Sequence, residues 1–384
     1  MPATPKLDSY YTLGRTGLRV SPLALGTMTF GTEWGWGSDK ETARRMVDTY
    51  VEAGGNFFDT ADLYTNGTSE TWLGEFIAER NLRDKAVIAT KFTYNAEPGN
   101  PNAGGNGRKN MLRAVEGSLK RLGTDYIDLY YLHTWDRLTP AEEVMRTLDD
   151  LVRSGKVRHV GLSDVPAWYA SRAQAIAEFR GYEPVSTLQL EYSLVERNIE
   201  REHVALATGH GMGITVWSPL GSGLLSGKYR PSEDGGSGAG RLETMKGSTI
   251  PAFQKFTPRN WRIVAELEAV AKQMNRGMAQ VALNWIANRP GVASVILGAT
   301  KLSQLEDNLA ALSFAIPPEL AARLDAASAP EALFPYTFFE DGQQQRIHGG
   351  VTVAGKPEGY APTVRIPGVE AGSELWVPAA TGER

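Results

Sequence analysis

The chain has 384 residues, of which 42% are hydrophobic and 22% charged, and its formal net charge is -4. Such a composition is typical of a globular protein with a sizeable core, and a small negative charge argues against a nucleic-acid partner. The sequence contains no cysteine, which excludes disulfides and thiolate chemistry. It has no leader-like apolar segment at its start and no apolar run of the ~18 residues that a membrane span needs, so we expect a cytoplasmic protein without a membrane segment.

The chain alternates between two kinds of segment after a β-hairpin predicted over residues 10–20. Short apolar runs favour strands, and the segments between them repeat their apolar residues at helical spacing. Strands are expected at 23–27, 56–59, 87–91, 127–132, 160–162, 187–190, 214–217 and 294–297. Helices are expected at 39–53, 69–80, 108–122, 140–153, 168–180, 200–208, 261–274 with 279–287, and 303–312.

Eight strand and helix pairs of this kind predict an α/β fold, a closed (β/α)8 TIM barrel preceded by the hairpin. An open doubly wound sheet is the alternative. Residues 1–328 would form the barrel, with a mobile Gly- and Ser-rich loop at 221–257. Residues 329–384 would form an irregular C-terminal extension, with irregular strands over 346–368. Its aromatic residues predict that the extension packs on the barrel or on a neighbouring subunit, and they are Phe334, Tyr336, Phe338 and Phe339.

Polar residues stand where several predicted strands end, which is the catalytic face of a parallel barrel. Asp59, Lys91 and His133 each close an apolar strand, and Tyr64 lies in the loop after Asp59. Each residue alone has an ordinary explanation, as a turn former, a strand-end lysine, a core histidine or a half-buried aromatic. Their combination at one end of the barrel predicts an active site.

Several motifs occur in register with these four residues. They are LGTMTFG at the first strand, GLSD at the fifth, LQLEYS at the sixth, WSPLGSGLLSGKY at the seventh and GATKLSQLEDN at the eighth. With this ordered set the chain resembles the aldo-keto reductase family over residues 10–316, and within it the aryl-alcohol-dehydrogenase-like and potassium-channel-β-like branch. The resemblance implies that Tyr64 is the proton donor in a catalytic tetrad with Asp59, Lys91 and His133.

The chemistry of the four side chains agrees with that implied role. Hydride delivery to a carbonyl leaves negative charge on oxygen, which must be stabilised and protonated. A free tyrosine has a pKa of ~10, and an ammonium beside it lowers that pKa. Lys91 would supply this charge to Tyr64, Asp59 would hold Lys91, and His133 would orient the carbonyl. None of these groups carries a hydride, so a cofactor is required.

The resemblance also implies a nicotinamide cofactor site. Ser163 and Gln189 would bind the carboxamide, and the Trp217 indole would stack on the ring. Asp164 stands where the family usually has asparagine, and a carboxylate cannot donate to the amide oxygen. The remaining implied cofactor contacts lie at the first strand, along the pyrophosphate and around the adenosine, and they are Gly26, Thr27, Met28, Ser218, Leu220, Ser222, Lys228, Gly298, Thr300, Gln304, Asp307 and Asn308.

The identity of the cofactor depends on one departure from the family pattern. Many relatives have an arginine where this chain has Thr300, and that arginine binds the 2′-phosphate of NADPH. Lys228, Lys301 and Gln304 remain as phosphate contacts. We therefore expect NADP(H), with NAD(H) as the alternative. No GxGxxG motif follows the first strand, which argues against a Rossmann fold.

Aromatic residues on the predicted loops suggest an aromatic or bulky apolar carbonyl substrate, with ordinary loop packing as the alternative. The expected substrate contacts are Trp34, Trp36, Phe92 and Trp135. Besides a carbonyl reductase, two other functions fit: a redox-sensing regulatory subunit, and a dehydratase or aldolase with Lys91 as a Schiff base. A small-molecule carbonyl is the expected partner, no metal is expected, and assembly into a homo-oligomer stays open.

Overall fold

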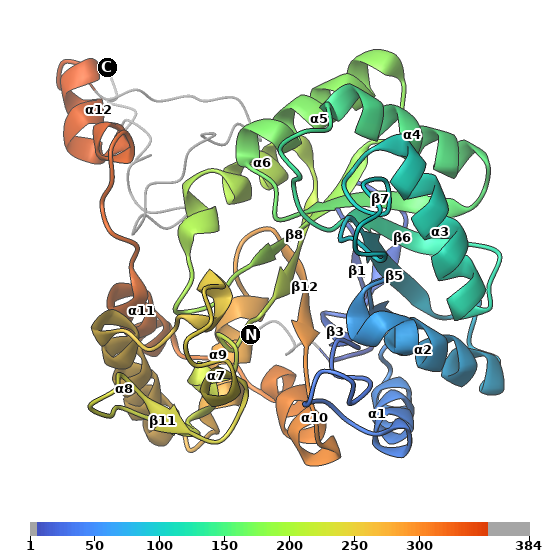
Figure 1. The fold of residues 1–384 in the computed structure, drawn as a ribbon. Helices are drawn as coiled ribbons and strands as arrows, with labels where there is room; N and C mark the ends of the chain where they lie inside the picture. The colour runs from blue at the N-terminus through green and yellow to red at the C-terminus, as the bar shows by residue number, and fades with distance from the viewer. Residues whose placement is uncertain (1–5, 352–384) are drawn as a thin grey trace.

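Eight parallel strands close into a barrel in the computed structural model, which describes residues 6–351 (Figure 1). The predicted (β/α)8 fold is therefore confirmed, and the open sheet is excluded. The strands follow the order β12-β3-β4-β5-β6-β7-β8-β9 around the barrel. Their bounds are β3 (Leu23–Gly26), β4 (Phe57–Asp59), β5 (Val87–Phe92), β6 (Ile127–Leu132), β7 (Val157–Ser163), β8 (Val185–Glu191), β9 (Gly213–Trp217) and β12 (Val292–Leu297).

Helices surround the barrel and bury the outward face of every strand, which is why the strands read as continuous apolar runs. The longer helices are α1 (Lys40–Glu52), α2 (Thr68–Glu79), α3 (Arg108–Leu122), α4 (Ala141–Arg153), α5 (Ala167–Arg180), α6 (His203–His210), α8 (Pro258–Gln273), α9 (Met278–Ala287), α10 (Leu302–Leu309) and α11 (Pro318–Ser328). Local signals explain their bounds, because the Asp39 side chain caps α1 and Gly123 ends α3 in a left-handed conformation. Within residues 6–351, no helix is both long and apolar enough to cross a membrane.

The N-terminal hairpin closes the amino-terminal end of the barrel. Its strands β1 (Tyr11–Thr12) and β2 (Arg19–Val20) pair antiparallel. Leu13 and Val20 are fully buried in a cluster with residues at the strand starts. Gly14 has a φ of +59°, and a Cβ atom there would lie 2.5 Å from the Ser186 carbonyl oxygen. The turn therefore requires glycine at this position, and the opposite end of the barrel is left for the site.

Residues 221–257 contain short elements rather than a featureless loop. They include η3 (Leu224–Ser226), β10 (Tyr229–Arg230), β11 (Ser237–Gly238), α7 (Arg241–Thr244) and η4 (Pro251–Phe253). Buried Lys255 forms an ion pair with Glu191 at 2.8 Å and so attaches the end of this segment to β8. The segment is therefore partly structured, and its predicted mobility stays a prediction.

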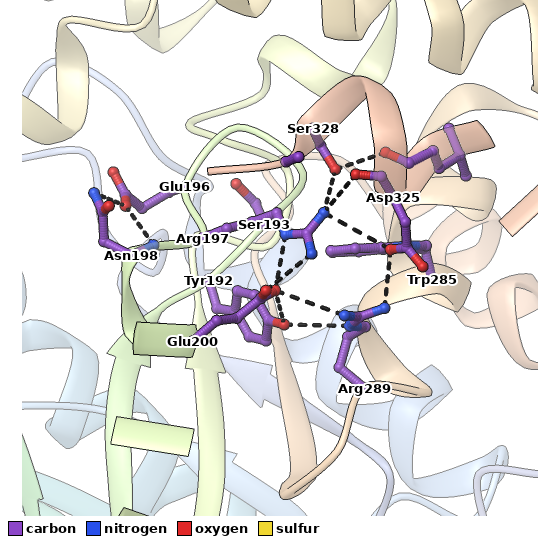
Figure 2. A network of polar contacts seen from close by, with 12 residues as sticks. Tyr192, Ser193, Glu196, Arg197, Asn198, Glu200, Trp285, Arg289, Asp325 and Ser328 are labelled. Carbon is purple, nitrogen blue, oxygen red and sulfur yellow. Dashed lines mark hydrogen bonds and ion pairs between the residues drawn. The ribbon is translucent and has the colours of Figure 1, made fainter. Parts of the chain in front are cut away.

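A buried arginine connects the loop after β8 to the last barrel helix, as Figure 2 shows. Arg197 immediately precedes the short helix η2 (Asn198–Arg201). It donates two hydrogen bonds, at 2.8 and 2.9 Å, to the carboxylate of Glu200 within that helix. It also donates to Ser328 Oγ at 2.7 Å and to the Asp325 carbonyl oxygen at 3.0 Å. Helix α11, which the sequence pattern did not predict, is therefore held to the site-bearing face.

The C-terminal extension begins after α11 and places α12 (Asp341–Ile347) at the periphery (Figure 1). Phe334 and Phe338 are 80% and 55% exposed, so the expected burial of these rings against the barrel is not seen. Tyr336, in η6 (Tyr336–Phe339), does contact it, because its hydroxyl donates to Glu202 Oε1 at 2.7 Å. Irregular strands had been expected from residue 346, but 346–347 end a helix; residues 352–368 lie outside the described part. Packing against a neighbouring subunit stays a prediction.

Candidate active site

The four predicted catalytic residues meet at the carboxyl ends of the barrel strands. Asp59 ends β4, Lys91 lies near the end of β5, and His133 follows β6. Tyr64 begins the short helix η1 (Tyr64–Gly67), in the loop after β4. Lys91 Nζ lies 2.6 Å from Asp59 Oδ1 and 3.1 Å from Tyr64 Oη. The Tyr64 and His133 ring centroids are 5.8 Å apart.

The Lys91 ammonium is fully buried and directs its hydrogens to three acceptors. These are Asp59 Oδ1, Tyr64 Oη and the Thr60 carbonyl oxygen, the last at 2.8 Å. Burial by itself lowers the pKa of Lys91, but Asp59 and Tyr64 raise it, and the resulting pKa lies above the ordinary value. Lys91 is therefore a fixed positive charge, and because it donates to Tyr64 Oη, the Tyr64 hydroxyl hydrogen is free for another acceptor.

Burial raises the pKa of the Tyr64 hydroxyl, and the Lys91 charge opposes that change. Burial prevails, so the net pKa lies above the ordinary value of tyrosine. The expected lowering of the Tyr64 pKa by Lys91 is present, but the opposing effect of burial is larger. Its physical reason is that the ring is only 9% exposed. Tyr64 thus keeps its proton throughout the neutral range.

A strained turn holds Tyr64 in place. The next two residues, Thr65 and Asn66, have left-handed φ values of 45° and 55°, which is unusual for a β-branched residue. Thr65 Oγ1 donates to the Phe30 carbonyl oxygen at 2.7 Å, which links this turn to the loop after β3. The Trp34 ring, from that same loop, meets Tyr64 edge-on with centroids 6.4 Å apart.

His133 is held as a neutral imidazole. Burial lowers its pKa well below the ordinary value, and the positive charge of Lys91 lowers it further. A neutral imidazole carries one N–H donor and one acceptor nitrogen. The Tyr94 ring packs edge-on against His133, with centroids 5.0 Å apart. Tyr94 is 47% exposed and was not predicted from the sequence.

Gln189, predicted to bind a nicotinamide carboxamide, lies within reach of the tetrad. Its Nε2 donates to Asp59 Oδ2 at 2.8 Å. A carboxylate only accepts hydrogen bonds, so the amide nitrogen of Gln189 must face Asp59. The side-chain oxygen of Gln189 is then the atom that remains for a ligand.

The residues predicted around a nicotinamide ring are also brought together. Ser163 ends β7, and its Oγ is buried with no hydrogen-bond partner among the described residues. Asp164 follows it with a φ of 44°, and its Oδ1 accepts a hydrogen bond from Trp217 Nε1 at 3.0 Å. The surrounding protein atoms raise the pKa of Asp164 to about 7, although the residue is exposed to solvent. Ser163 therefore has a hydroxyl that is available to a ligand, and Trp217 has a half-buried indole that a ligand can contact.

Two cations, Lys228 and Arg241, lie near each other. Burial lowers the pKa of Lys228, and the Arg241 charge lowers it further. Gly240, which has a φ of +148° that favours glycine, lies next to the Lys228 ammonium. The Arg241 guanidinium lies 4.3 Å from the centroid of the Trp36 ring. In the described residues neither cation takes part in an ion pair, and Arg241 was missed because it follows a Gly-rich stretch without any pattern.

Two predicted contacts at the first strand have structural partners. A Cβ atom at Gly26 would lie 2.6 Å from Ile296 Cγ2, so Gly26 allows β3 and β12 to pair closely. Thr27 is buried, and its Oγ1 lies 3.1 Å from the Asp59 carbonyl oxygen and 2.7 Å from Ser69 Oγ. A cofactor contact at this strand would therefore use other atoms than the Thr27 hydroxyl, and half-buried Met28 remains available.

The loop after β9 uses its serine side chains internally. Ser218 Oγ accepts from the Ser222 backbone N–H at 3.0 Å, and Ser222 Oγ donates to the Ala252 carbonyl oxygen at 3.0 Å. Leu220 packs against the hydrophobic core. These contacts define the shape of the loop, and the predicted role of its residues toward a pyrophosphate stays a prediction.

The predicted adenosine segment forms the start of α10. Gln304 Oε1 accepts from the backbone N–H groups of Thr300 and Lys301, at 2.9 and 3.2 Å, and so caps the helix. Asp307 Oδ1 accepts from Gln280 Nε2 at 2.7 Å. Only the amide nitrogen of Gln304 is then left for a phosphate. Of the other residues predicted here, Gly298 is exposed and Asn308 is buried.

The predicted substrate residues divide into two groups. Trp34 and Trp36 lie beside Tyr64 and pack on each other with centroids 5.6 Å apart. Phe92 is fully buried and stacks on Tyr130 outside the barrel, so its predicted contact with substrate is wrong. Side chains alternate along β5, and because Lys91 points into the barrel its neighbour must point outward.

Trp135 belongs to a separate aromatic cluster, with Trp168 and Tyr169. Its backbone N–H donates to the Asp164 carbonyl oxygen at 3.4 Å. Among the described residues its ring packs on none of the four predicted catalytic side chains, so its role toward a substrate stays a prediction.

The fold and the site define an oxidoreductase on a (β/α)8 barrel. The Aldo/keto reductase family model matches residues 22–329. A norsolorinic acid reductase of Aspergillus flavus is 34% identical, over 91% of this chain and 89% of the relative. An aryl-alcohol dehydrogenase of Pestalotiopsis microspora is 35% identical, over 89% and 88%, and an uncharacterized oxidoreductase of Bacillus subtilis is 37% identical, over 82% and 94%. The chain belongs to the aldo/keto reductase family.

Proposed function

We propose that the protein reduces aldehydes or ketones to alcohols with NAD(P)H, and that Tyr64 donates the proton. The observation that carries this proposal is the hydrogen bond from Lys91 Nζ to Tyr64 Oη, at 3.1 Å. This bond leaves the Tyr64 hydroxyl hydrogen for a substrate carbonyl oxygen. It also places a positive charge next to the oxygen on which negative charge appears once the proton has left.

The roles of the other tetrad residues follow from their contacts. Asp59 accepts from Lys91 and keeps the ammonium directed at Tyr64. His133, neutral because burial lowers its pKa, donates a hydrogen bond to the carbonyl oxygen without competing for the proton. An aldolase or dehydratase that uses Lys91 as a nucleophile is disfavoured, because the ammonium is fully hydrogen-bonded and neighbouring charges hold its pKa above the ordinary value.

The residues around Trp217 suit a nicotinamide cofactor, which supplies the hydride when bound. The buried Ser163 Oγ lacks a partner among the described residues and would meet the carboxamide, together with the free oxygen of Gln189. The Trp217 indole would stack on the ring, and the neighbouring cations Lys228 and Arg241 would hold phosphate groups.

NADP(H) is the favoured cofactor, with NAD(H) as the alternative. Lys301 lies at the exposed start of α10, where its ammonium would meet a 2′-phosphate; the Thr300 hydroxyl, 3.2 Å from Gln304 Oε1, would have to turn from that oxygen to contribute. Gln304 contributes less than expected, because its oxygen caps the helix.

Three aromatic rings favour an aromatic carbonyl substrate: Trp34 packs on Tyr64, Trp36 packs on Trp34, and Tyr94 packs on His133. The names of the norsolorinic acid reductase and aryl-alcohol dehydrogenase relatives agree with that class. The cytoplasmic location stays a prediction.

Tyr64→Phe tests the proposal. NADPH-dependent reduction of a panel of aromatic aldehydes should fall by a factor of ~100 or more, because the proton donor is removed. The dissociation constant for NADPH should stay within about threefold of the wild-type value, because the hydroxyl is directed at the carbonyl. Tyr126→Phe, at the amino-terminal end of β6, is the matched control. Unchanged turnover in Tyr64→Phe would refute the mechanism, and negligible turnover by the wild type would favour the regulatory alternative.

A further inference from the structure

The carboxyl group of Asp164 is held firmly at the proposed nicotinamide site. Its backbone N–H donates to the Gln189 carbonyl oxygen at 3.2 Å, and its own carbonyl oxygen accepts from Trp135 at 3.4 Å. Its Oδ1 accepts from Trp217 Nε1 at 3.0 Å. Three barrel strands, β7, β8 and β9, therefore determine where this carboxyl lies.

No cation neutralises that carboxyl at close range among the described residues. Lys91 on β5 is the positive charge that acts on it, and Lys91 is already paired with Asp59. Glu191, at the end of β8, is the nearest acidic influence and is itself paired with Lys255. The surrounding protein atoms are the main cause that raises the pKa of Asp164 to about 7, although the residue itself is exposed to solvent.

The charge of Asp164 acts on the groups that face the reaction site. It raises the pKa of Tyr64 and also that of Tyr94. His133 lies beside both rings but is neutral, because its pKa is well below the ordinary value. No positive charge of the four catalytic candidates is therefore paired with the Asp164 carboxylate.

We propose that Asp164 sets the preference of the site for the oxidised over the reduced nicotinamide cofactor. This inference rests on the proposed function, because it places the ring against Trp217. The oxidised ring carries a positive charge and the reduced ring carries none. A carboxylate hydrogen-bonded to the stacking indole attracts only the charged form. With the oxidised cofactor bound, the Asp164 carboxylate would stabilise the positive charge of its ring.

The preference depends on pH with a definite sign. Below the pKa of about 7 the Asp164 carboxyl is protonated and does not distinguish the two forms. Above it the carboxylate favours the oxidised form. Binding of the oxidised cofactor near neutral pH then lowers the pKa of Asp164 and releases a proton, whereas binding of the reduced cofactor does not.

The test measures dissociation constants of NADP+ and NADPH for the full chain by calorimetry, at about pH 6 and about pH 8.5, on either side of the titration. In the wild type the ratio of the NADPH to the NADP+ dissociation constant should rise about tenfold between the two pH values. In Asp164→Asn the ratio should change less than about twofold. Asparagine keeps the shape, the acceptor for Trp217 and the tolerance of a left-handed φ.

A second readout is the proton released on binding, obtained from the binding heats in buffers of different ionisation enthalpy. The wild type should release protons with NADP+ but not with NADPH near pH 7, and Asp164→Asn should show no difference. Both cofactor forms carry the 2′-phosphate, so any proton that its binding releases or takes up does not contribute to the difference between NADP+ and NADPH. Asp62→Asn is the matched control, because burial raises the pKa of Asp62 to about 7 as well, and it should behave as the wild type.

Equal ratios in the wild type and in Asp164→Asn at both pH values would overturn this inference and leave the proposed reductase function intact. Binding of neither cofactor form would overturn both. A loss of reduction in Tyr64→Phe with an unchanged NADP+ preference would support both, since Tyr64 donates the proton and Asp164 acts on the cofactor.

Discussion

Gln189 Nε2 donates a hydrogen bond of 2.8 Å to Asp59 Oδ2, from β8 across the barrel to β4. The other carboxylate oxygen of Asp59 accepts from Lys91 at 2.6 Å. The buried Asp59 carboxylate therefore has a donor on each oxygen, and one of them comes from a residue predicted to hold the cofactor. The tetrad and the predicted cofactor site are one hydrogen-bonded unit.

Gln189→Leu should lower the free energy of unfolding by about 1–3 kcal/mol, because it leaves one oxygen of a buried carboxylate without a donor. Urea denaturation measures this change. In a double-mutant cycle with Asp59→Asn, the two effects should be non-additive, since they remove the same interaction. Strict additivity would show that the two side chains do not interact in solution.

Lys91→Met should reduce carbonyl reduction strongly and move the alkaline limb of the rate profile to higher pH. The Lys91 charge lowers the pKa of Tyr64 against the effect of burial, so its loss raises that pKa further. Tyr64 then keeps its proton to higher pH but donates it less readily. The rate of NADPH oxidation, measured across the alkaline range, gives the limb. A limb at the wild-type position would mean that Lys91 does not tune Tyr64.

Asp62→Asn should stabilise the protein at alkaline pH. Burial, assisted by the charge of Glu70, raises the pKa of Asp62 from 3.8 to about 7, and Asp62 Oδ1 is buried without a partner among the described residues. A raised pKa in the folded state means that stability is full below about pH 4 and falls as the pH rises toward 7. We expect the variant to gain about 1–3 kcal/mol above neutrality. The difference between the urea midpoints of the variant and the wild type should be larger at alkaline than at acidic pH. An equal difference at both pH values would contradict the raised pKa of Asp62.

Thr300→Arg should widen the preference for NADPH over NADH. The wild type offers a hydroxyl and the point charge of Lys301, whereas a guanidinium binds a phosphate through two parallel hydrogen bonds. We expect the ratio of dissociation constants to rise about tenfold, mostly through tighter NADPH binding. Fluorescence titration with both cofactors measures it, with Thr300→Lys as the control for charge alone. Tighter NADH than NADPH binding by the wild type would refute the phosphate assignment.

The order of strands and helices could be predicted because buried parallel strands are continuously apolar. The predicted segments 108–122 and 127–132 match α3 and β6 residue for residue. Helix α11 was missed because it buries only Leu320, Leu324 and Ser328, too few for a clear helical period.

The four catalytic candidates could be predicted because strand ends in a barrel share one face. Contacts that depend on side-chain direction could not. Phe92 is next to Lys91 in sequence yet faces the helices. The side-chain oxygen of Gln304 accepts a hydrogen bond that caps α10. Arg241 reaches the site only because a Gly-rich segment folds back onto Trp36.

The contacts of Arg197 show how far along the chain the barrel's own side-chain contacts extend. Its last partner along the chain is Ser328, and Arg259 donates to the carbonyl oxygen of that same residue at 2.9 Å. A chain truncated after Ala329 keeps the hydrogen bonds of Arg197 and Arg259 to α11. A chain truncated before Asp325 loses the hydrogen bonds that hold the loop after β8 to that helix. We therefore expect residues 330–351, which contact the barrel through Glu331 and Tyr336, to matter less to the stability of the barrel than α11 does.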